Sequence, residues 1–70
     1  IAYQLEAAGE VESELRNVLG QRQAVLFNGE QVVGAHNLRV DLASELLAGT
    51  YWVVLKRDGV IVDTYSLLKR

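Results

Sequence analysis

Closely spaced glycine-containing turns are the feature that most limits what this chain can fold into. They fall at Ala8-Gly9, Leu19-Gly20-Gln21, Asn28-Gly29, Gly34, Ala48-Gly49 and Asp58-Gly59. The segments between them are mostly about 5–15 residues long, a spacing typical of short strands. The spacing therefore predicts an all-β protein.

Side-chain alternation supports this interpretation in the first half of the chain. From Glu10 to Arg16, charged residues alternate with apolar or small residues at period two, which predicts a half-buried strand. A helix through Leu5 to Leu19 is the weaker alternative, because Gly9 interrupts its start and only three spaced apolar positions would face a core.

The pairs Asn28-Gly29 and Asp58-Gly59 tolerate positive φ and are predicted to form two-residue hairpin turns. The strand before the second pair, 51–57, places Tyr51, Val53 and Leu55 on one face and Trp52 on the other. Both faces are largely apolar, so we expect this strand to be central.

The complete prediction is a small Ig-like antiparallel β-sandwich of about six or seven strands, forming a single domain over residues 1–70. Residues 41–48 are interpreted as a bridging loop, because Gly49 follows too soon for a stable helix. The predicted strands are Ile1–Leu5, Val11–Val18, Gln23–Asn28, Ala35–Asp41, Gly49–Arg57 and Val60–Leu68.

Composition excludes several classes of protein. The chain has no cysteine, so a disulfide framework and a thiolate metal site are excluded. Its formal net charge of -2 argues against a nucleic-acid partner, and no apolar run is long enough to span a membrane.

Because the domain is small, we expect an exposed edge strand and weak self-association through it. The chain begins at Ile1 and contains no methionine, and we expect it to be a fragment of a larger protein.

No catalytic or metal site can be assembled from the sequence, and we predict a non-enzyme without metal or cofactor. His36 is the only histidine and is interpreted as a structural residue at a strand edge or turn. Glu10, Glu12 and Glu14 share one strand face and are interpreted as solvated, since calcium requires oxygens converging from a loop. None of the three serines lies in a Gly-x-Ser-x-Gly motif.

Two features are candidates for contact with a partner. Trp52 is predicted to point outward, where it could contact a sugar ring or a protein partner. The chain closes on an apolar pair followed by two basic residues, Leu67-Leu68-Lys69-Arg70.

The order and spacing of motifs along nearly all 70 residues resemble the C-terminal sorting domain of the type IX secretion system. A related Ig-like fold occurs in flagellar hook-capping proteins. The motifs are Ile1-Ala2-Tyr3-Gln4-Leu5, Ala8-Gly9, Val11, Asn17-Val18-Leu19-Gly20-Gln21, Leu26-Phe27-Asn28-Gly29-Glu30, Gly34-Ala35-His36, Asp41, Leu47-Ala48-Gly49-Thr50-Tyr51, Asp58-Gly59 and Leu67-Leu68-Lys69.

The resemblance implies a non-catalytic address at the C-terminus of a secreted protein from a Gram-negative bacterium. In that family an outer-membrane translocon reads the domain, and a sortase-like peptidase usually removes it. The parent cargo passes through the periplasm and is then secreted or held at the cell surface. By position, Gly20 and Gly49 match the turn glycines and Tyr51 the tyrosine after the glycine. Leu67, Leu68 and Lys69 match the terminal recognition strand, to which Arg70 adds a second charge.

The chain departs from the family pattern in its second strand, where Ser13 replaces an inward apolar residue and Arg16 an aromatic one. Thr64-Tyr65 also stands where a basic pair is common. The alternative function is an Ig-like accessory module of an extracellular protein that binds carbohydrate or a protein partner through Trp52.

Overall fold

The computed structural model describes residues 1–42 and 46–70, which contain six strands and two antiparallel sheets. The strands are β1 (Ala2–Leu5), β2 (Gly9–Arg16), β3 (Arg22–Gln31), β4 (Gly34–Asn37), β5 (Gly49–Arg57) and β6 (Val60–Lys69). The described residues contain no helix, so the predicted all-β sandwich is confirmed and the helix alternative for residues 5–19 is wrong.

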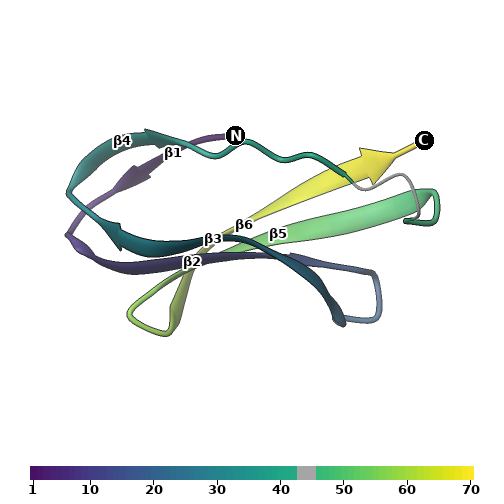
Figure 1. The fold of residues 1–70 in the computed structure, drawn as a ribbon, viewed down its shortest axis with the longest axis horizontal. Coiled ribbons are helices and arrows are strands. Elements are labelled where there is room, and N and C mark those ends of the chain that lie inside the picture. Colours follow the sequence, from purple (N-terminus) through teal and green to yellow (C-terminus); the bar gives the residue numbers. More distant parts are fainter. Residues whose placement is uncertain (43–45) are drawn as a thin grey trace.

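The larger sheet has the order β3-β2-β5-β6, and β1 and β4 pair separately. In Figure 1, β1 and β4 form a second layer, and the segment after β4 runs on towards the start of β5. The central place predicted for β5 is confirmed, because β5 lies between β2 and β6. β3 and β6 are the two edges of the larger sheet, so among the described residues both have one unpaired side.

The core lies between the two sheets and follows the alternation of β2 and β5. Trp52 points to the outer face and is 41% exposed, as predicted from its place next to the inward-facing Tyr51 in the same strand. Leu38, just after β4, continues the inner layer. The buried cluster consists of Tyr3, Leu5, Val11, Leu15, Leu38, Tyr51, Val53 and Leu55.

The hairpin predicted at Asp58-Gly59 is confirmed. Asp58 has φ 51° and Gly59 has φ 80°, so both central residues adopt the positive φ of a type I′ turn. The Asp58 carboxylate also accepts a hydrogen bond from the Glu10 amide at 3.0 Å, and the Asp58 amide donates to the Glu10 carbonyl at 2.8 Å. This turn is therefore fixed to the start of β2.

The hairpin predicted at Asn28-Gly29 is wrong, because both residues lie inside β3 opposite Glu12 and Val11. A Cβ on Gly29 would lie 3.3 Å from the Phe27 ring, so the glycine makes room for an aromatic side chain within the strand. The chain leaves the sheet only after Gln31 and crosses to β4 in the other layer.

Several predicted boundaries also shift. The strand predicted at Val11–Val18 begins at Gly9 and ends at Arg16. The strand predicted at Ala35–Asp41 is the shorter β4, which ends at Asn37. Beyond it, the only backbone hydrogen bonds to the β1 segment within the described part of the chain join Leu38 to Ile1. The described residues of the bridging loop at 41–48 are neither helix nor strand, and residues 43–45 lie outside the described part of the chain.

Candidate recognition site at one end of the sheet

Three segments lie at the end of the sheet where β5 begins and β6 finishes. Gly49 lies opposite Lys69, Thr50 opposite Leu68 and Tyr51 opposite Leu67. The turn between β2 and β3, which contains Gly20, reaches the same end (Figure 1). All the recognition residues named from the resemblance therefore lie at one end of the molecule.

A mostly apolar pocket of about 320 Å³ joins two of these segments. Val18, Leu19 and Leu47 on its rim are 70%, 78% and 82% exposed, although large apolar side chains usually seek burial. The Tyr51 hydroxyl donates a 2.6 Å hydrogen bond to the Leu47 carbonyl, which holds the segment before β5 against the sheet. The pocket is lined by Asn17, Val18, Leu19, Gln23, Leu46, Leu47, Ala48, Gly49, Thr50 and Tyr51.

Gly20 and Gly49 have φ of 81° and 147°, conformations that residues with a Cβ rarely adopt. Apart from the glycine and its two chain neighbours, no atom of residues 1–42 and 46–70 lies within 4 Å of a Cβ built at either position. The turn at Gly20 is closed by Asn17, whose Oδ1 accepts hydrogen bonds of 3.0 Å from the amides of Leu19 and Gln21. Both glycines therefore have conformational roles that shape the site.

The end of β6 divides into structural and accessible residues. Leu67 is half-buried and packs against the core, whereas Leu68 is 62% exposed on the opposite face. Lys69 is half-buried and Arg70 is exposed. At this end of the strand, Leu68, Lys69 and Arg70 are thus the residues that a partner could contact directly.

Trp52 belongs to the outer face of the same region. It lies opposite Arg16 on β2 and opposite Ser66 on β6. The Arg16 guanidinium donates to the Gly20 carbonyl at 2.8 Å and to the Glu14 carboxylate at 3.0 Å. Arg16 therefore links the outer face to the turn between β2 and β3.

The three glutamates on one face of β2, Glu10, Glu12 and Glu14, are not all solvated, which corrects the prediction for Glu14. Glu14 is only 1% exposed and forms ion pairs of 2.7 Å with Lys56 and 3.0 Å with Arg16. The hydrogen bond from Lys56 is the main cause that lowers the pKa of Glu14, with Arg16 adding to it against the effect of burial. Glu10 is exposed and Glu12 half-buried.

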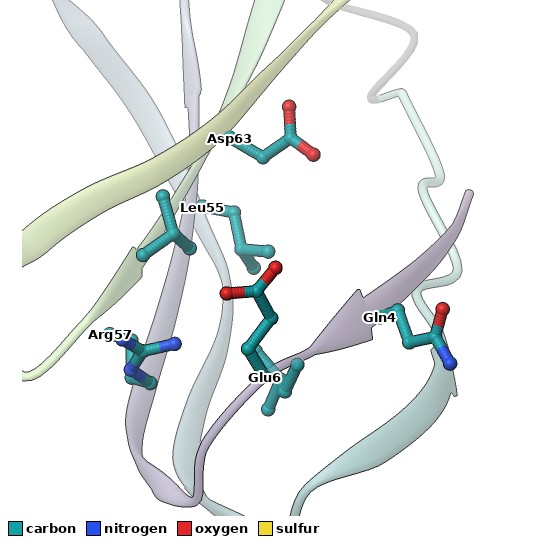
Figure 2. Close-up of a pocket in the computed structure, with 7 residues that line it drawn as sticks. Gln4, Glu6, Leu55, Arg57 and Asp63 are labelled. Atoms are coloured by element: carbon teal, nitrogen blue, oxygen red, sulfur yellow. The ribbon is translucent and has the colours of Figure 1, made fainter.

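A second pocket, of about 310 Å³, lies between the end of β1 and the strands β5 and β6. Figure 2 shows the Glu6 side chain reaching into the space near Arg57 and Asp63, with Leu55 behind it. Two carboxylates beside one guanidinium do not make a cation site. Among residues 1–42 and 46–70, no three His, Cys, Asp or Glu side chains are grouped to hold a metal.

His36 packs its ring on Tyr3, with centroids 5.6 Å apart and an interplanar angle of 22°. Its Nε2 lies 2.7 Å from the Val32 carbonyl oxygen. These contacts give the histidine a packing role between β1 and β4.

No family model, curated protein or solved structure matches this chain. Within the described residues, the structure contains no helix long and apolar enough to cross a bilayer.

Proposed function

We propose that this chain is a non-catalytic sorting domain that directs a parent protein across the outer membrane of a Gram-negative bacterium through a type IX secretion system. The observation that supports the proposal most is the gathering of the recognition residues. The start of β5, from Gly49 to Tyr51, lies beside the end of β6 on one side and shares a pocket with the residues before the Gly20 turn on the other.

The chemistry of this end suits recognition by a protein. Exposed apolar side chains surround the pocket, and two basic residues follow the exposed Leu68. An unpaired edge strand adds backbone donors and acceptors, which extended partners use in strand addition. The outer-membrane translocon is the proposed reader, and a sortase-like peptidase the proposed processing enzyme.

The test is a charge reversal at the end of β6 in a chain fused to a reporter cargo. Lys69→Glu with Arg70→Glu should leave the cargo folded but held in the periplasm of a host that has the type IX system. The melting temperature should change by no more than a few degrees, because neither side chain forms an ion pair with another described residue and unpaired charges at the surface contribute little to stability.

A matched control carries the same charge change elsewhere, as Arg39→Glu with Ala7→Glu and Ala35→Glu. All three residues are exposed and lie outside the Gly20 turn, the start of β5 and the end of β6. The control should be secreted normally. Normal secretion of the Lys69 and Arg70 variant, or equal retention of the control, would contradict the proposal.

The second candidate function is an accessory module that binds carbohydrate or a protein partner. The exposure of Trp52 on the outer face, opposite Arg16 and Ser66, favours it, because an aromatic ring flanked by polar groups can stack on a sugar. Titration with soluble polysaccharides, followed by tryptophan fluorescence and compared with Trp52→Ala, distinguishes this function from sorting.

A further inference from the structure

We infer that β6 is the self-association edge of this chain, and that a second copy adds its own β6 antiparallel about an axis through Ser66. This inference is independent of the proposed sorting function. It rests on the free backbone groups of β6, the regularity of that strand and the positions of its two charged residues.

The unpaired side of β6 can be assigned from one hydrogen bond. The Thr64 amide donates to the carboxylate of its neighbour Asp63 at 2.9 Å, so this amide is not directed at β5. Groups that point to the same side of a strand recur every second residue, so the backbone groups of Ser66 and Leu68 also face away from β5. These groups are available to a new strand.

β6 is the more regular of the two edges. Its pairing with β5 is uninterrupted from Asp63 to Lys69, and its one register shift lies before Asp63. The other edge, β3, has two register shifts against β2. Bulges twist an edge and disrupt the ladder, so β3 is the poorer template for strand addition.

Charge selects a second copy as the occupant and fixes its register. With Ser66 opposite Ser66 of the second copy, Asp63 lies opposite Lys69, and the symmetry repeats this pair. In this register Thr64 lies opposite Leu68 of the second copy. The backbone groups of both residues point away from β5, so they can form hydrogen bonds with each other. Shifting the second copy by two residues in either direction removes the contact between Asp63 and Lys69.

The same aspartate explains why the association should be weak. In the single chain, Asp63 accepts hydrogen bonds from the Thr64 amide and from the Tyr65 hydroxyl at 2.7 Å. The bond to Asp63 is the main cause that raises the pKa of Tyr65 to about 12. Association requires the Thr64 amide to turn from Asp63 to the partner backbone, so Asp63 partly protects the free edge.

Sedimentation equilibrium of the 70-residue chain over a wide concentration range provides the test. The wild-type chain should show a reversible monomer–dimer equilibrium. Asp63→Lys and Lys69→Asp each place like charges opposite one another twice, so each should weaken dimerisation by about tenfold or more. An equimolar mixture of the two variants restores both opposite-charge pairs and should dimerise at least as well as wild type.

Arg70→Asp is the matched control for Lys69→Asp, because it makes the same charge change without altering the pair of Asp63 and Lys69. Its dimerisation should stay close to that of wild type, and circular dichroism should show that every variant is folded. A monomeric wild type, single variants that dimerise as well as wild type, a mixture that stays monomeric, or growth to higher oligomers through β3 would each overturn the inference. The secretion test is separate, because it reads cargo location and not the mass of the purified chain.

Discussion

The Nζ of Lys56 lies 2.7 Å from Oε1 of Glu14, joining the two central strands of the larger sheet on its outer face. Lys56 is paired in register with Glu12 and reaches diagonally to Glu14. The Glu14 side chain is 2% exposed and that of Lys56 is 25% exposed, so this pair is better shielded than an ordinary surface ion pair.

Removing the lysine charge should destabilise the domain. Lys56→Met keeps most of the apolar stem but leaves the buried carboxylate with Arg16 alone, so the free energy of unfolding should fall by about 1–3 kcal/mol. Urea denaturation measures the change. Adding Glu14→Gln to the same chain should recover part of the loss, and an unchanged midpoint for Lys56→Met would show that the pair contributes no stability.

The lowered pKa of Glu14 predicts a specific acid sensitivity. Relative to its ordinary value of 4.5, the folded state holds the ionised form more strongly than the unfolded state does. The stability from this group is therefore complete above pH 4.5 and is lost as the pH falls through the lower folded-state pKa. The unfolding free energies of wild type and Glu14→Gln should converge as the pH is lowered below 4.5. A difference that stays constant across this range would contradict the assignment.

Removing the buried hydroxyl of Ser13 should stabilise the domain. Ser13 is 0% exposed, and its Oγ has no hydrogen-bond partner among the described residues. Ser13→Ala removes an uncompensated polar group, so the free energy of unfolding should rise by about 1 kcal/mol. Ser66→Ala, on an exposed position of β6, is the control and should change stability by less than about 0.5 kcal/mol. A loss of stability in Ser13→Ala would indicate that the hydroxyl has a partner in solution.

Local signals predicted part of the fold correctly. Asp58-Gly59 joins strands that are adjacent in sequence, and the alternation around Trp52 is set by the geometry of a single strand. Asn28-Gly29 has the same turn chemistry but lies in a strand, because pairing with β2 continues past it to Gln31. The choice between turn and strand depended on a partner strand that local sequence does not identify.

In the candidate site, too, contacts set by a local hairpin could be predicted, whereas contacts set by the pairing of distant strands could not. The meeting of Tyr51 with Leu67 follows from the hairpin, which could be predicted. The proximity of the Gly20 turn depends on the pairing of β2 with β5, which joins segments distant in sequence. The burial of Glu14 also depends on that pairing, because Lys56 reaches it from the neighbouring strand.

The contact between Gly9 and Asp58 gives the last prediction. A Cβ at Gly9 would lie 2.7 Å from Oδ2 of Asp58, and this carboxylate cannot retreat freely because its Oδ1 accepts a hydrogen bond from the Glu10 amide. Gly9→Ala should therefore lower the free energy of unfolding by about 1–3 kcal/mol, as overpacked positions do. Asp58→Gly removes the carboxylate while preserving the positive φ of the turn, so in that background the same Gly9→Ala change should cost less than half as much. Urea denaturation of wild type, the two single variants and the double variant completes this double-mutant cycle. Strictly additive changes in the free energy of unfolding would show that the carboxylate is not what excludes a side chain at position 9.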